Sequence, residues 1–219
     1  MRFDIEEALR YLGAGGTQDQ TLRQSVQREA EALTAQLKPR YIYKVVSLTR
    51  SGEELLLPEA GLSLPGRTAR LMLEECHQAV VLACTLGAEF DALLRTQQAR
   101  DMARAVILDA CGSAWVEAGC DAAEKEIAAL FPGKYLTDRF SPGYGDLPLA
   151  LQPGLCRALD APRRIGLHVT GSLLLNPAKS VTALLGVAGT PQMRRIRGCA
   201  CCSMNQTCQL RKGGKTCAP

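Results

Sequence analysis

The chain has 219 residues, of which 47% are hydrophobic and 22% are charged, and its formal net charge is +4. This composition fits one globular domain with a sizeable core and excludes disordered, collagen-like and coiled-coil proteins. No apolar run approaches the roughly 20 residues of a membrane-spanning helix. The first ten residues mix charged and apolar side chains, which argues against a secretory signal and predicts a cytoplasmic protein.

Charge and cysteine are both unevenly distributed along the chain. The last 59 residues hold nine Lys and Arg and no Asp or Glu, whereas the first 160 residues carry a net charge of −5. Five of the ten cysteines are dispersed and the other five fall within the last 21 positions. We therefore expect one domain over residues 1–190 and a basic, cysteine-rich tail over residues 191–219. The dispersed cysteines, which we expect to be small core residues, are Cys76, Cys84, Cys111, Cys120 and Cys156.

The first half of the chain mixes helical and strand patterns. Two helices are predicted over residues 4–12 and 17–38, because glycines separate them and Pro39 ends the second. Residues 41–46 are β-branched and aromatic, and Ser51-Gly52 followed by three leucines predicts that this strand returns as a hairpin. The remaining predicted elements are a helix over residues 66–75, a buried strand over residues 79–84 and a helix from about residue 88.

The longest predicted helix covers residues 100–130. Ala110, Ala114, Glu117 and Asp121 share one of its faces, so that Glu117 could lie beside a ligand in a cleft. The alternative is a solvent-exposed face on which Asp121 pairs with Lys125.

Residues 167–187 predict two strands around a turn at Asn176-Pro177. Because helices and strands do not alternate regularly, we expect an α+β fold, with a mostly antiparallel twisted sheet and long helices in a single domain.

The segment Arg139 to Pro148, RFSPGYGDLP, carries the chemistry. Pro142-Gly143 suits the central positions of a type II turn, so we expect a rigid loop with exposed backbone amides. Arg139 can grip a carboxylate with two hydrogen bonds, and Tyr144 offers a flat ring for a heterocycle or a cation. An isolated Pro-Gly is usually no more than a tight turn, but the longer string is more specific.

This string, followed by Gln152 and by IGLHVTGSLLLNPAKSVTALLGV over residues 165–187, resembles the activation domain of vitamin B12-dependent methionine synthase. That family has an Arg-x-x-Pro-Gly-Tyr fingerprint that binds S-adenosylmethionine. The similarity covers about residues 110–187. The N-terminal EALRYLG also looks like the free-standing relatives found in bacteria with split methionine synthases.

The resemblance implies roles for six residues. Arg139 would hold the methionine portion of the ligand, and the stretch Ser141, Pro142, Gly143 and Tyr144 would line the nucleoside. Glu117 falls near a family carboxylate on the preceding helix. Family members carry a further tyrosine beyond the Ser-Val strand, whereas this sequence has no tyrosine after Tyr144, which implies a difference in ligand affinity or geometry.

The resemblance also implies a reaction and partners. Oxidised cob(II)alamin would be reduced by one electron and trapped by methylation from S-adenosylmethionine, while this domain supplies proximity and orientation. The sequence contains no Asp-x-His-x-x-Gly cobalamin motif, and we expect His77 and His168 to be ordinary packed or surface residues. Cobalamin should therefore arrive on a separate methionine synthase or other corrinoid protein, with a flavodoxin-like protein as electron donor.

The tail contains a second candidate site. Cys199 and Cys202 have the spacing at which two thiolates reach one ion, and Cys208 and Cys217 complete four ligands for zinc or an iron–sulfur cluster. Cys201 is an alternative to Cys202, and free or redox-exchanging thiols are an alternative to the metal site. The absence of aromatic residues after Tyr144 argues against nucleic-acid binding, so a protein partner better explains the basic tail.

Two other functions stay open at this point. One is a metal- or iron–sulfur-bearing redox module that delivers an electron to a corrinoid protein. The other is a non-catalytic S-adenosylmethionine-binding protein.

Overall fold

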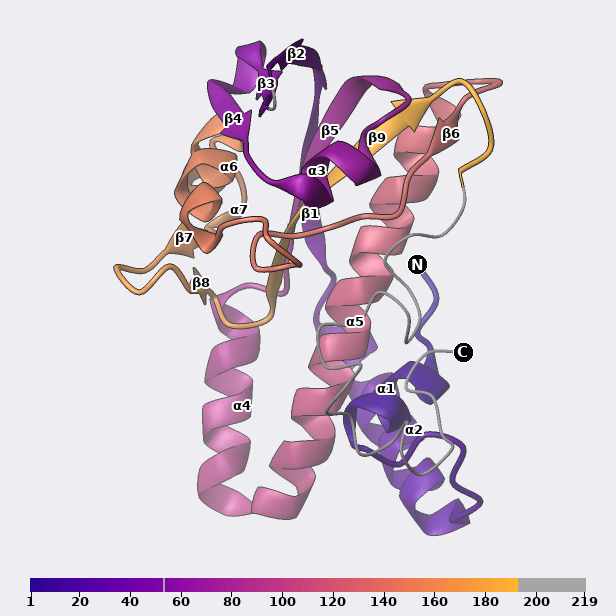
Figure 1. Ribbon diagram of the computed structural model, residues 1–219. Helices are drawn as coiled ribbons and strands as arrows, with labels where there is room; N and C mark the ends of the chain where they lie inside the picture. Colours follow the sequence, from indigo (N-terminus) through magenta and orange to yellow (C-terminus); the bar gives the residue numbers. More distant parts are fainter. Residues whose placement is uncertain (53, 193–219) are drawn as a thin grey trace.

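The structure is a computed structural model that describes residues 1–52 and 54–192 (Figure 1). The predicted tail ligands Cys199, Cys202, Cys208 and Cys217, and almost all of the predicted tail, lie outside the described residues. No helix in the described ranges is both long and apolar enough to cross a membrane.

A four-stranded antiparallel sheet forms the centre of the molecule. Its order is β1 (Arg40–Ser47), β5 (Cys76–Thr85), β9 (Ser180–Ala188) and β6 (Tyr135–Leu136). The sheet contributes to hydrophobic clusters on both faces, because successive side chains of β5 alternate between them: Ala79, Val81 and Ala83 join one cluster, Val80, Leu82 and Cys84 the other. Its two central strands are therefore almost continuously apolar.

Helices pack on one side of this sheet (Figure 1). They are α1 (Ile5–Tyr11), α2 (Gln20–Gln36), α4 (Ala88–Arg100) and α5 (Met102–Ala129). Of these, α5 lies against the strands, and α1, α2 and α4 pack around α5. α5 lies close to the sheet, because a Cβ atom at Gly119 would be 2.5 Å from Pro39 Cβ and 2.7 Å from Cys84 Sγ. This close packing places the middle of α5 beside the segment that follows β6.

Shorter elements cover the other face. They are β2 (Thr49–Ser51), β3 (Glu54–Leu57), η1 (Pro58–Ala60), β4 (Leu62–Leu64), α3 (Arg67–Met72), η2 (Leu149–Leu151), α6 (Gln152–Leu159), α7 (Ala161–Ile165), β7 (His168–Val169) and β8 (Leu175–Asn176). β2, β3 and β4 form a small antiparallel sheet, and β7 pairs with β8.

The predicted α+β class and mostly antiparallel sheet are confirmed, and so is the burial of all five dispersed cysteines. The predicted hairpin between residues 41–46 and 55–57 is wrong, because β1 pairs with β5 and the turn at Ser51-Gly52 joins β2 to β3. Strands do flank Asn176-Pro177, but β8 and β9 belong to different sheets. α6 and α7 were not predicted.

Candidate functional site

The loop that follows Phe140 contains the predicted turn. Phe140 exchanges two backbone hydrogen bonds with Leu184 of β9, so the chain leaves the sheet edge at this residue. Tyr144 N donates to the Ser141 carbonyl at 3.0 Å, and Gly143 has φ +93°. A proline before a glycine with positive φ, closed by this hydrogen bond, is a type II turn, as predicted.

The amides of this turn are less available than predicted. The N–H groups of Gly143 and Tyr144 both donate within the loop, the former to the Leu147 carbonyl at 2.8 Å. Pro142 and Leu147 are buried, whereas Gly143 and the Tyr144 side chain are exposed. The loop therefore presents a glycine backbone and an aromatic ring, on a framework that its own hydrogen bonds make rigid.

Arg139 lies on the opposite side of the segment from Phe140, toward α5. Its Nη1 donates to Asp121 Oδ1 at 2.8 Å and also to Glu124 Oε1, and its Nη2 donates to Glu117 Oε2. The Arg139 side chain is only 11% exposed, compared with 29%, 57% and 28% for Glu117, Asp121 and Glu124. We refer to these four residues as the Arg139 cage.

The Arg139 cage is strongly anionic as a unit. Burial alone lowers the pKa of the Arg139 guanidinium, but the carboxylates of Glu117 and Glu124 outweigh burial and raise this pKa above its ordinary value. The guanidinium is thus permanently charged. Three carboxylates face one guanidinium, so a ligand that adds positive charge would be favoured here.

The sequence identified part of this cage. Glu117 and Asp121 lie one turn apart on α5 and both face Arg139, so the alternative pairing of Asp121 with Lys125 is wrong as the principal contact. Glu124 was not predicted. It lies three residues after Asp121, and residues at this spacing share a helix face, which is the signal that could have identified it.

The loop that follows Phe140 makes a second contact through Asp146, which was not predicted from the sequence. Its carboxylate accepts hydrogen bonds from the backbone N–H groups of Arg67 at 2.6 Å and Thr68 at 2.8 Å, at the first turn of α3. Its own N–H donates to Thr68 Oγ1 at 3.3 Å. The hydrogen bonds from Thr68 and Arg67 lower the pKa of Asp146 to about 2.

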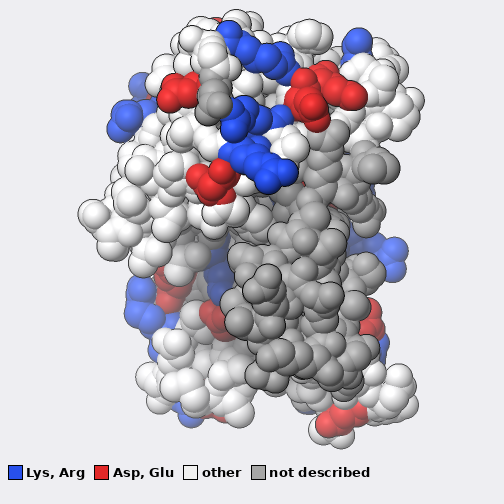
Figure 2. Space-filling model, in the orientation of Figure 1, with Lys and Arg blue, Asp and Glu red and all other residues white. Residues whose placement is uncertain are grey.

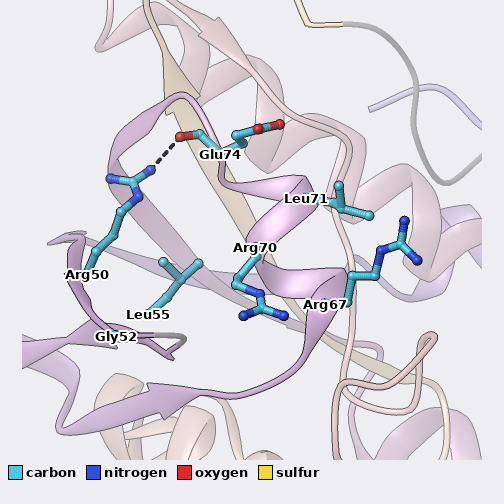
Figure 3. Close-up of a pocket in the computed structure, with 7 residues that line it drawn as sticks. All are labelled: Arg50, Gly52, Leu55, Arg67, Arg70, Leu71 and Glu74. Carbon is cyan, nitrogen blue, oxygen red and sulfur yellow. Dashed lines mark hydrogen bonds between the residues drawn. The ribbon is translucent and has the colours of Figure 1, made fainter.

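Two cavities lie outside the predicted ligand residues. One, of about 210 Å³, lies between the β2–β3 turn and α3 and is lined by Arg50, Arg67, Arg70 and Glu74, among others (Figure 3). Basic side chains also gather on the upper part of the face shown in Figure 2. None of the six predicted ligand residues lines this cavity.

The second cavity, of about 310 Å³, lies beside α1, α4 and α5, and Tyr11 and Asp109 line it. Burial, together with the charges of Glu117 and Glu7, raises the pKa of Tyr11 to about 12. This aromatic ring from EALRYLG therefore lies within electrostatic reach of the Arg139 cage. Asp109 is held by Lys179, whose Nζ is 2.9 Å from its Oδ2.

Within residues 1–52 and 54–192, no group of three or more His, Cys, Asp or Glu side chains is arranged to hold a metal ion.

Of three comparisons with known proteins, only the one with solved structures found a similarity. No family model matches the sequence, and no curated protein matches it. The structure is similar to a crystal structure of the MetH reactivation domain bound to AdoHcy, with a TM-score of 0.64 and 15% sequence identity, over 98% of this chain and 82% of that chain. The fold that the sequence resemblance implied is therefore confirmed.

The low pKa of Asp146 predicts an acid-sensitive contribution to stability. Because the folded pKa of about 2 lies below the ordinary value of 3.8, this contribution is fully present above about pH 4 and is lost as the pH falls toward 2. Thermal unfolding followed by circular dichroism from pH 6 to 2 should show a steeper loss of stability for wild type than for Asp146→Asn below pH 4. Parallel curves would contradict this.

Proposed function

We propose that this chain binds S-adenosylmethionine and supports the reductive remethylation of cobalamin held by a separate methionine synthase or other corrinoid protein. The observation that carries the proposal is the meeting of Arg139 with the α5 carboxylates, next to the turn that carries Tyr144. The fold of the chain is also similar to that of the MetH reactivation domain, whose crystal structure has AdoHcy bound.

The charge of the Arg139 cage suits this ligand. S-adenosylmethionine has a sulfonium, an ammonium and a carboxylate group, so its net charge at neutral pH is positive. The Arg139 cage has one cation and three carboxylates, so a further positive charge from the ligand would be attracted to it. The ligand carboxylate would take hydrogen bonds from Arg139, and the ammonium would face the carboxylates of α5.

Arg139 has donors left for a ligand. Three of its five N–H groups are committed to carboxylates, two on Nη1 and one on Nη2. Among the described residues, Nε and the second N–H of Nη2 have no hydrogen-bond partner, so a ligand carboxylate could accept from this edge of the guanidinium. Asp121 is the partner most easily exchanged as well, because it is the most exposed of the three carboxylates.

The loop would hold the nucleoside. Tyr144 is exposed and can stack on an adenine ring, and the glycine at position 143 lets backbone approach the ligand closely. The Ser141 carbonyl and the Gly143 N–H are committed to the turn. Contacts to the nucleoside would therefore come mainly from the Tyr144 ring and from backbone groups that the turn leaves free.

The proposed role needs no general acid or base from this chain. The sulfonium methyl group is already activated, and reduced cobalamin on the partner protein supplies the nucleophile. The residues named above would hold the methyl donor in one orientation, and orientation alone is a large catalytic effect.

The tail supports a second proposal, that of a metal-bearing redox module serving the same corrinoid partner. The spacing of Cys199, Cys202, Cys208 and Cys217 suits four thiolate ligands of zinc or an iron–sulfur cluster, and nearby Lys and Arg favour the thiolate form. A flavodoxin-like donor, being acidic, would fit the basic charge of the tail.

Replacing Arg139 tests the proposed ligand site. Arg139→Ala should weaken S-adenosylmethionine binding at least tenfold in isothermal titration calorimetry, because it removes the paired hydrogen bonds to the ligand carboxylate. Arg139→Ala also leaves three carboxylates uncompensated, so Arg139→Lys, which keeps the charge without the fork, serves as the folding control. If folded Arg139→Ala bound like wild type, the proposal would fail.

Replacing Glu117 tests the charge argument. Glu117→Gln removes one negative charge from the Arg139 cage and should weaken S-adenosylmethionine more than S-adenosylhomocysteine, which lacks the sulfonium charge. The difference should shrink as salt concentration rises. Glu126→Gln, on the same helix but paired with Tyr41 and Tyr43, is the matched control. Equal losses of affinity for the two ligands would show that the charge of Glu117 does not discriminate between them.

The tail is tested by its metal content. Protein purified without oxygen should contain about one equivalent of zinc, or show the broad visible absorption of an iron–sulfur cluster. Cys199→Ser together with Cys208→Ser should abolish either signal, whereas Cys156→Ser, in the buried core, should leave it intact. Absence of both metals from wild type would exclude the metal-bearing module.

A further inference from the structure

The loop that carries Tyr144 is fastened to α3, a helix that lies 78 residues earlier in the chain. The Asp146 carboxylate accepts from the N–H groups of Arg67 and Thr68, and Thr68 Oγ1 accepts from the Asp146 N–H. The two segments thus cap each other in a reciprocal way. Gly66 at the start of α3 has no side chain to cap the helix, so Asp146 does so from across the structure.

Two glycines allow this contact. Gly66 has φ +94°, and a Cβ atom there would lie 2.8 Å from the Asp146 carboxyl group. Gly145 has φ +55°, and its Cβ would lie 2.2 Å from Thr68 Oγ1. Any side chain at either position would push the loop away from α3. We name Gly66, Thr68, Gly145 and Asp146 together the loop latch.

The loop latch fixes the second end of a short segment. Its first end is Phe140, which is buried and bonded to Leu184 in the sheet. Only five residues separate Phe140 from Asp146, and Pro142 restricts one of them further. Tyr144 stands two residues before Asp146, so its position depends directly on where the latch holds the chain.

α3 itself is well anchored. Ala69 and Met72 are buried in the core, and Arg50 Nη2 donates to the carbonyls of Leu73 and Cys76 at 3.1 and 3.2 Å, just beyond the end of the helix. Figure 3 shows Arg50 reaching toward this end of α3. The latch therefore connects the loop to a fixed part of the molecule.

We propose that the loop latch positions the Ser141–Tyr144 turn for its ligand, with Asp146 and Thr68 as positioning residues. This inference rests on the proposed function, because it concerns the same ligand. A loop held in place before binding loses less conformational entropy on binding, and this gain appears as affinity. The competing explanation is that Asp146 only caps α3 and contributes to stability alone.

Ligand affinity and thermal stability, measured on the same variants, separate these explanations. Asp146→Asn replaces one of the two accepting oxygens by an NH₂ group. It should weaken S-adenosylmethionine binding about tenfold in calorimetry performed well below the melting temperature of the variant. Asp19→Ala is the helix-cap control, because the Asp19 carboxylate caps α2 through the N–H groups of Thr21 and Leu22 and is not connected to the loop. It should lower the melting temperature and leave affinity unchanged.

Substitutions of Thr68 provide a second test, which can be used even if Asp146→Asn does not fold. Thr68→Val removes the acceptor for the Asp146 N–H and should weaken binding about threefold, while Thr68→Ser, which keeps the hydroxyl, should restore wild-type affinity. Gly145→Ala should weaken binding through its contact with Thr68. Gly61→Ala, at φ +63° with no atom within 4 Å of the added Cβ, controls for backbone strain.

The outcomes distinguish the two proposals. Wild-type protein that fails to bind S-adenosylmethionine would overturn the proposed function itself. Wild-type protein that binds, together with latch variants that lose only melting temperature, would overturn the positioning role and leave the proposed function intact. The expected result is a loss of affinity in Asp146→Asn, Thr68→Val and Gly145→Ala, and unchanged affinity in Asp19→Ala and Gly61→Ala.

Discussion

The nearly buried guanidinium of Arg139, shared by three carboxylates, joins the edge of the central sheet to the long helix α5. A guanidinium in this position must be compensated, because an unpaired buried charge is very costly. α5 supplies the compensation from Glu117, Asp121 and Glu124, and its close packing on the sheet, through Gly119, brings them within reach. The ion-pair cluster thus depends on the packing of the helix, and the position of Arg139 depends on both.

Elements with strong local signals were predicted from the sequence. β5 is a continuous apolar run, and α5 has a long helical pattern that ends before Pro132-Gly133. Pairing partners were harder to predict, because a strand such as β1 finds its partner more than thirty residues later in β5, and turn residues nearby suggested a hairpin instead. α6 and α7 were missed because the second residue of each is a proline. Proline breaks the interior of a helix but is tolerated in its first turn.

The site was predictable to the extent that its residues lie in one segment. The type II turn follows from Pro142-Gly143. The resemblance to a known family placed Arg139 and Glu117 at one ligand site, but their ion pair is seen only in the structure. The contact between Asp146 and α3 could not be found in this way, because it joins two segments 78 residues apart and its signal is divided between them. Each of the two segments looks ordinary by itself. Both a Gly-Asp pair in a loop and a glycine before a helix are typical of common turns.

The two parts of the candidate site differ in how they would respond to a ligand. The turn that carries Tyr144 is closed by its own hydrogen bonds and held at both ends, so its geometry exists before binding. The Arg139 cage is also ordered, but its members are charged groups whose hydrogen bonds a ligand carboxylate or ammonium can join or exchange. A ligand that carries both a flat ring and a charged amino-acid group would therefore meet a rigid surface at one end and an exchangeable one at the other. The rigid end favours affinity through a small loss of entropy, and the exchangeable end makes affinity depend on the charge of the ligand.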